Sequence, residues 1–129
     1  MSARILIVED DRLTAKMLYR RFQKRGYQID MAENGRLGVD KALTIRPDLV
    51  LMDMHMPVMS GYQAVQLLRR RGYQGQIVGL SASAMAVDKQ KALEAGCNYF
   101  FSKPVERNFE ATVADLLRGK RENGSNFSG

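Results

Sequence analysis

Acidic residues stand directly after two short apolar runs of the sequence. Glu9 and Asp10 follow Ile5–Val8, and Asp53 follows Leu49–Met52. If the two runs form neighbouring strands, the three carboxylates converge, and their mutual repulsion would hold a proton on one of them. A divalent cation removes that problem, and hard oxygen ligands in a site open to water and phosphate favour Mg²⁺. An ionised Asp53 can then attack phosphorus.

A hydroxyl group and a lysine follow two further apolar runs. Ser81 comes after Ile77–Leu80, and Lys103 comes shortly after the aromatic run Tyr99–Phe101. A lysine and a metal ion can balance the charge on the equatorial oxygens of a transferring phosphoryl group, and the hydroxyl of Ser81 is a hydrogen-bond donor. The four strand ends together predict a site for phosphoryl transfer.

Each of these residues also has an ordinary structural interpretation. Asp10 or Asp11 can cap the helix that follows the first strand. An aspartate at a strand end, such as Asp53, is usually a turn residue, and Lys103–Pro104 can be a plain loop. The prediction therefore depends on all four strand ends carrying a suitable group in one chain.

The apolar pattern predicts five strand–helix units. Continuous apolar runs indicate strands buried on both faces, and the more polar segment 27–31 indicates a strand at the sheet edge. Helical spacing fills the intervals, and the poor apolar stripe of 85–94 predicts the least firmly packed helix. This alternation requires an α/β fold with a mostly parallel sheet, right-handed crossovers and helices on both faces. The predicted strands are 5–8, 27–31, 49–52, 77–80 and 99–101, and the helical patterns cover 14–22, 39–43, 61–68, 85–94 and 109–117.

The composition indicates one globular domain. The chain has 129 residues, of which 45% are hydrophobic and 26% charged. No apolar run is long enough to cross a bilayer, the start has no signal-peptide pattern, and the one cysteine, Cys97, cannot form an intrachain disulfide, so we expect a cytoplasmic location.

The net charge of +6 allows a nucleic acid or an acidic protein as partner. Its cations cluster at 12–25 and 69–71 without a nucleic-acid-binding motif, and we favour solvated helix faces and helix C-termini.

Four blocks of the sequence, taken in order, resemble the signature blocks of two-component response-regulator receiver domains. The blocks are ILIVEDD at 5–11, LVLMDMHMPVMSG at 49–61, LSA at 80–82 and SKPV at 102–105. The resemblance extends over about residues 4–118, and four blocks with matching spacing are far more specific than any one of them.

The resemblance implies the fold in detail and the roles of the acidic residues. The expected fold is a doubly wound, flavodoxin-like three-layer sandwich, with a five-stranded parallel sheet in the order 2-1-3-4-5. Asp53 would be the phosphoacceptor. Glu9, Asp10, Asp53 and the backbone carbonyl of His55 would hold Mg²⁺.

The same resemblance implies how the phosphate is bound and sensed. Ser81 and Lys103 would bind it, and the Lys103–Pro104 peptide bond is expected to be cis. Ser81 and Phe100 would form the switch. Ser81 and its loop move toward the phosphate, Phe100 moves inward, and the face made by the fourth helix, fifth strand and fifth helix changes for partner binding.

Three positions bear on how this chain differs from its relatives. Ser60 stands where many relatives have aspartate, but it can still cap the helix that follows. Phe100 replaces a frequent tyrosine and has no hydroxyl. His55 and Ser83 stand two residues after the phosphoacceptor and the hydroxyl residue, where side chains flank the path of hydrolytic water, so we expect them to tune the phosphate lifetime. For His55, the alternative is an exposed loop residue without a role.

Partners and domain limits also follow from the resemblance. The phosphodonor would be a histidine kinase or a histidine phosphotransfer protein, and the downstream target or effector domain is not indicated. We expect no direct nucleic-acid or membrane contact, and no catalysis beyond self-phosphorylation and autodephosphorylation. Residues 1–119 would form the receiver domain, and 120–129, rich in Gly, Ser and Asn, would be a disordered tail or a linker stub.

Three other classes of protein fit the sequence less well. Haloacid-dehalogenase-type phosphatases need a second aspartate two residues after the nucleophile, where this chain has His55. A flavin-binding module of similar topology should have a Ser-, Thr- or Gly-rich phosphate loop after the first strand, where this chain has acids. A receiver-like module that takes no phosphate usually lacks a key acid or the lysine, and this chain has them all.

Overall fold

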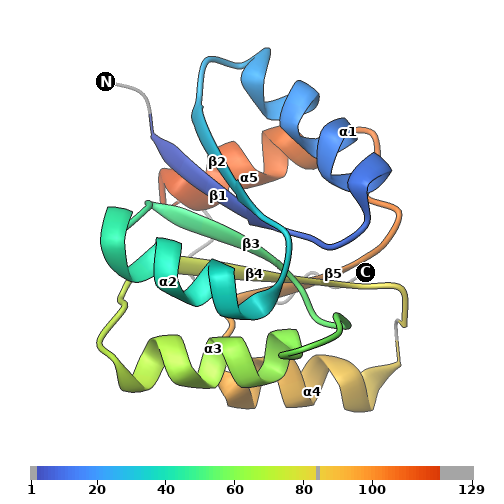
Figure 1. The fold of residues 1–129 in the computed structure, drawn as a ribbon. Helices are drawn as coiled ribbons and strands as arrows, with labels where there is room; N and C mark the ends of the chain where they lie inside the picture. Colours follow the sequence, from blue (N-terminus) through green and yellow to red (C-terminus); the bar gives the residue numbers. More distant parts are fainter. Residues whose placement is uncertain (1–2, 84, 120–129) are drawn as a thin grey trace.

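The computed structural model describes residues 3–83 and 85–119, so the predicted tail at 120–129 lies outside the described residues. Strands and helices alternate along the described chain (Figure 1). Among these helices, none is long and apolar enough to cross a membrane. The elements are β1 (Arg4–Val8), α1 (Arg12–Gln23), β2 (Gln28–Ala32), α2 (Gly35–Ile45), β3 (Leu49–Asp53), α3 (Gly61–Arg70), β4 (Gln76–Ser81), α4 (Ala86–Ala95), β5 (Tyr99–Ser102) and α5 (Phe109–Leu117).

The five strands form one parallel sheet in the order β2-β1-β3-β4-β5. This order confirms the predicted fold class, and the polar strand β2 lies at the edge as expected. The register between β1 and β3 pairs Val8 with Met52. The next residues, Glu9 just after β1 and Asp53 at the end of β3, therefore lie side by side.

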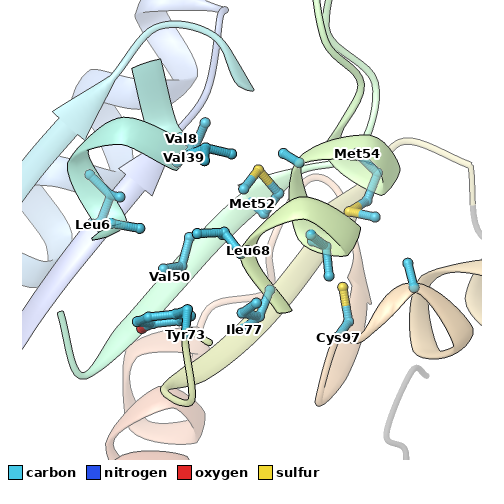
Figure 2. Close-up of a cluster of buried hydrophobic side chains, with 14 of the residues drawn as sticks. Leu6, Val8, Val39, Val50, Met52, Met54, Leu68, Tyr73, Ile77 and Cys97 are labelled. Carbon is cyan, nitrogen blue, oxygen red and sulfur yellow. The ribbon is translucent and has the colours of Figure 1, made fainter. Parts of the chain in front are cut away.

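Two hydrophobic clusters fill the space between the sheet and its two helical layers. Helices α1 and α5 cover one face, and α2, α3 and α4 cover the other. On the second face, Val50, Met52 and Leu68 pack together (Figure 2). Burial of each such side chain stabilises the fold by about 1.5–3 kcal/mol. The packed core thus holds the sheet ends, and the polar residues on them, in fixed positions.

Helix α4 packs against the core through fewer buried side chains than the neighbouring helices do. Its buried residues are Ala92 and Ala95, both small. At its other end, Met85 and Val87 are 64% and 56% exposed, and Met85 begins the helix without a side-chain cap. The weak packing expected for this helix from its poor apolar stripe is confirmed. Among the described helices, α4 would lose the least buried contact on moving.

Arg21 and Arg69 stand in the last turns of α1 and α3, as the helix C-terminus interpretation expects, but both also make structural hydrogen bonds and are not simply solvated. The Arg69 guanidinium donates hydrogen bonds to the carbonyl oxygens of Gly96, Tyr73 and Gly75 and to Oδ1 of Asn98. Arg69 therefore fastens the end of α3 to the turn between α4 and β5. Arg21 on α1 likewise bonds to Glu110 and to backbone carbonyls before α5.

Gly61 is required where α3 begins beneath the end of β3. A Cβ atom at this position would overlap the carbonyl oxygen of Asp53 and lie 2.5 Å from Cα of Met54. Both neighbours are backbone atoms, so neither can rotate away. At Gly38, by contrast, an added Cβ would meet side-chain atoms, the two Cγ methyl groups of Val8 at 2.8 Å.

We expect Gly61→Ala to lower the free energy of unfolding by about 1–3 kcal/mol, because overpacking outweighs the better helix propensity of alanine. Gly38→Ala is the matched control, and its loss should be smaller. Urea unfolding of both variants measures the difference. A Gly61→Ala variant as stable as the parent would show that the backbone contact is not limiting.

Candidate functional site

Three carboxylates meet at the carboxyl ends of β1 and β3. Glu9 and Asp53 are only 4% and 3% exposed, whereas Asp10 is exposed. One carboxylate oxygen from each residue lies within 4.8 Å of the others. The convergence expected from the sequence is therefore present, and two of the three charges are withdrawn from water.

Lys103 reaches this acidic cluster from the loop after β5. Its ammonium group donates a hydrogen bond to Oε1 of Glu9 at 3.0 Å and lies 3.4 Å from Oδ1 of Asp53. Its backbone N–H donates to the carbonyl oxygen of Ser81 at 2.8 Å, which ties the loop to the end of β4. The Lys103–Pro104 peptide bond is cis, as expected.

Burial and like charge dominate the electrostatics of the cluster. Desolvation, and then the charge of Glu9, raise the pKa of Asp53 to about 7. The N–H of His55, which donates to Oδ1 of Asp53 at 3.2 Å, and the Lys103 ammonium oppose this rise. Burial alone would lower the pKa of Lys103, but the hydrogen bond to Glu9 and the charges of both acids raise it overall.

The cluster fits a divalent cation of the hard class. All three side-chain ligands are carboxylate oxygens within 4.8 Å of one another, and the Lys103 ammonium contacts two of them. Three carboxylates thus face one ammonium, and burial together with the charge of Glu9 keeps the pKa of Asp53 raised in spite of this lysine. Oxygen ligands and uncompensated negative charge favour Mg²⁺ over softer metals.

Asp11 is not one of the three clustered acids, although its backbone N–H donates a hydrogen bond to Oε2 of Glu9 at 3.0 Å. It is the N-cap of α1, and its carboxylate accepts hydrogen bonds from the N–H and the hydroxyl of Thr14. These bonds lower the pKa of Asp11. Of the two residues that the sequence offered as a cap, Asp11 is the one that caps α1. Ser60 also caps its helix, α3, in a reciprocal arrangement with Gln63.

The residues at the end of β4 connect the cluster region to α4. Ser81 is fully buried, and its hydroxyl oxygen accepts a hydrogen bond from the N–H of Ser83 at 3.0 Å. The Ser83 hydroxyl in turn bonds to the carboxylate of Asp88 in the first turn of α4. Sequence analysis missed Asp88, because an acid in the first turn of a helix is already explained by the helix dipole.

His55 and the loop after it lie at the mouth of the cluster. His55 is exposed, and its imidazole packs edge-on against the ring of Tyr62, with the ring centroids 5.9 Å apart and the planes at 72°.

Further along, Val58 has a φ of 73° and is 81% exposed, in a tight turn closed by a hydrogen bond from the N–H of Met59 to the carbonyl of Pro57. A β-branched residue in this conformation is strained. No spacing rule in the sequence pointed to Tyr62.

Phe100 is already buried in this structure. The ring is 3% exposed and belongs to the same hydrophobic cluster as Ala92, Ala95 and Cys97. The predicted inward movement therefore has no exposed starting position here. The reason is the apolar space between β5 and α4, which small side chains leave open for an aromatic ring without a hydroxyl to satisfy.

A family model described as the response regulator receiver domain matches residues 5–112. This match covers most of the chain, and the chain belongs to that family. The strand order and the placement of the acids, the serine and the lysine at strand ends agree with the resemblance noted in the four sequence blocks.

Curated relatives and solved structures give the same picture. Over 119 residues the chain is 36% identical to the transcriptional regulatory protein PcoR of Escherichia coli, covering 92% of this chain and 53% of the relative. It is 41% identical over 110 residues to hybrid signal transduction histidine kinase G of Dictyostelium discoideum, covering 80% of this chain and 3% of that protein. The chain thus spans about half of the first relative and a small part of the second.

Among solved structures, the chemotaxis protein CheY4 of Vibrio cholerae superposes with a TM-score of 0.81 at 27% identity, over 92% of this chain and 98% of that one. A CheY-like receiver domain protein from Methanospirillum hungatei has a TM-score of 0.86 at 22% identity, over 95% and 99% of the two chains. The second likeness concerns the fold alone.

The raised pKa of Asp53 predicts a pH-dependent stability. Because the folded pKa lies above the unfolded value of 3.8, this carboxyl favours folding below about pH 4, and its contribution is lost as the pH rises toward 7. Without divalent cations, we expect Asp53→Asn to be more stable than the parent at pH 7, by on the order of 2 kcal/mol, and the gap to shrink toward pH 4.

Urea unfolding between pH 4 and 8, with EDTA and then with Mg²⁺, measures this gap. The added cation should narrow it, since it stabilises the ionised carboxylates of the parent. Asp40→Asn, at an exposed position on α2, is the control and should show no such trend. A gap that stays constant with pH would contradict the raised pKa.

Proposed function

We propose that this chain accepts a phosphoryl group on Asp53 from the phosphohistidine of a histidine kinase or phosphotransfer protein, within a receiver unit of residues 1–119. One observation carries the proposal. The Lys103 ammonium lies within 3.4 Å of a carboxylate oxygen of Asp53, which is itself buried beside Glu9. A lone structural aspartate needs no such arrangement, whereas a phosphoacceptor needs positive charge close to its attacking oxygen.

In the proposed reaction, a carboxylate oxygen of Asp53 attacks phosphorus, and the new O–P bond forms as the P–N bond to the donor imidazole breaks. Lys103 pairs with the phosphoryl oxygens, and the Ser81 hydroxyl donates a hydrogen bond to one of them. Glu9, Asp10, Asp53 and the His55 carbonyl would hold Mg²⁺, whose contribution is positive charge that keeps Asp53 ionised and neutralises the phosphoryl oxygens.

The hydrogen bonds beyond Ser81 suggest how the phosphate is sensed. When the Ser81 hydroxyl turns to donate to a new phosphate, the hydrogen bond that it accepts from the N–H of Ser83 changes. The Ser83 hydroxyl bonds to Asp88 at the start of α4, so the change reaches this helix. Since α4 is weakly packed, this change alters the α4–β5–α5 face. Phe100 then follows the movement of α4 from a position that is buried at the outset.

The surface of α1 suits a protein partner of acidic character. Leu13 is 78% exposed and Met17 36%, and Arg12, Lys16 and Arg20 are exposed on the same helix. Arg12 stands in the first turn, where the helix dipole disfavours a cation, so helix stability does not explain it. The chain spans about half or less of the relatives described above, so the downstream target or effector domain stays unnamed in this proposal. The cytoplasmic setting stays a prediction.

Catalysis on other molecules is not part of the proposal. The position two residues after Asp53 carries His55, and a haloacid-dehalogenase-type phosphatase needs an aspartate there. The loop after β1 carries Glu9 and Asp10, and a bound flavin phosphate would be repelled by them. The chain acts on phosphate only through its own phosphorylation and autodephosphorylation.

Incubation with acetyl phosphate and Mg²⁺ tests the proposal directly. We expect intact-mass spectrometry to show one added phosphoryl group on the parent, none on Asp53→Asn, and none on the parent in EDTA. Lys103→Ala should be labelled at least about 100-fold more slowly, by loss of a charge-paired donor. Asp11→Asn, which alters only the cap of α1, should be labelled like the parent. An unlabelled parent, or a labelled Asp53→Asn, would reject the proposal.

Beryllofluoride with Mg²⁺, a stable mimic of the phosphoryl group, tests the switch. We expect amide resonances across residues 81–101 to shift on its addition, because the Ser81–Ser83–Asp88 bonds link the cluster region to α4. Resonances of the edge strand β2 serve as the internal control and should change little. Shifts confined to the loops around Asp53 would disprove the coupling to α4.

A further inference from the structure

Tyr62, near the start of α3, contacts both the mouth of the acidic cluster and helix α4. On one side the His55 imidazole packs edge-on against its ring at 5.9 Å between centroids. On the other side the ammonium of Lys91, on α4, lies 4.8 Å from the centroid of the same ring. An edge-on aromatic pair and a cation over a ring face are both attractive contacts. Tyr62 is thus a bridge between α4 and the residue next to the phosphoacceptor loop.

The ring of Tyr62, and not its hydroxyl, makes this bridge. The hydroxyl oxygen is buried, and no hydrogen-bond partner for it is present among the described residues. Burial, and then the charge of Asp88, raise the pKa of Tyr62, so the phenol stays neutral. A buried hydroxyl without a partner contributes nothing favourable to stability, and the aromatic contacts remain as the reason for an aromatic side chain here.

His55 is fixed at two points. Its backbone N–H donates to Oδ1 of Asp53 at 3.2 Å, and its imidazole rests on Tyr62. The first contact sets the distance of the residue from the phosphoacceptor. The second restricts the imidazole, which is otherwise exposed, to the side of the residue that faces Tyr62.

We propose that Tyr62 is a positioning residue through which the place of α4 sets the lifetime of the aspartyl phosphate. The inference rests on the proposed function, since it concerns a phosphate on Asp53. While Lys91 lies over the ring, Tyr62 holds the His55 imidazole as a shield against hydrolytic water. On phosphorylation the shift is confined to the amino end of α4 and Lys91 stays over the ring; when the rest of α4 is displaced, the Lys91 contact is lost, the aromatic pair loosens and hydrolysis accelerates. A partner that holds α4 in place therefore prolongs the phosphorylated state.

The decisive measurement is the half-life of phosphate on the full chain after labelling with acetyl phosphate and Mg²⁺ and removal of the donor. We expect Tyr62→Leu and His55→Ala each to shorten the half-life about two- to tenfold, and the double variant to shorten it no further, because both changes remove one shield. Tyr62→Phe keeps the ring and should behave like the parent. Lys91→Gln should shorten the half-life about twofold, the size of one exposed cation–ring contact.

Matched controls separate this role from a general loss of structure. Lys89→Gln removes the same charge from α4 at a position two residues away, on a different side of the helix, and should leave the half-life unchanged. His55 is the one histidine of the chain, so its ring protons give isolated NMR signals. These signals should move in Tyr62→Leu and stay in place in Tyr62→Phe.

The outcomes distinguish this inference from the proposed function. A parent that takes no label refutes the proposed function itself. A labelled parent whose half-life equals that of Tyr62→Leu, or a Tyr62→Phe variant as short-lived as Tyr62→Leu, refutes the positioning role alone. If Tyr62→Leu is too unstable to label, the phosphate half-life of Lys91→Gln, a change at an exposed position, is compared with that of Lys89→Gln. Equal half-lives in these two variants refute the positioning role.

Discussion

The structure of the site follows from one electrostatic constraint, the burial of two carboxylates side by side at the end of a parallel sheet. Glu9 and Asp53 lose most of their hydration, and a sheet core of apolar side chains lies directly beneath them. Such a pair is stable only with positive charge at hand. Lys103 supplies one charge from a loop fixed to β4. The negative charge that Lys103 leaves unbalanced favours the binding of a metal ion and the proposed transfer of a phosphoryl group.

The fold and the convergence of the acids were predictable because they depend on pattern and topology. Continuous apolar runs indicated the inner strands, and the polar character of 27–31 indicated the edge position of β2. Once strands β1 and β3 are parallel neighbours, residues at their carboxyl ends must meet. The same logic placed Ser81 and Lys103 at this edge. No side-chain geometry was needed for these predictions.

Other features depend on which rotamer a side chain adopts, and the sequence does not contain that information. Asp10 and Asp11 are chemically equal candidates for a helix cap, and only the path of the chain turns Asp11 toward Thr14. The pairing of Tyr62 with His55 and Lys91 joins three elements across the fold and has no regular spacing. The cations at 69–71 looked alike in sequence, yet the position of Arg69 opposite several free carbonyls gives it a structural role.

The bonds made by Arg69 have a mechanical consequence for α4. They fix the turn at Gly96, so the carboxyl end of α4 is a pivot, whereas at its amino end the side-chain hydrogen bond seen among the described residues is the one between Ser83 and Asp88. A rod pivoting about one end moves most at the other. In the proposed switch, a small rearrangement at Ser81 would therefore displace the amino end of α4 most, together with the exposed side chains of Met85 and Val87.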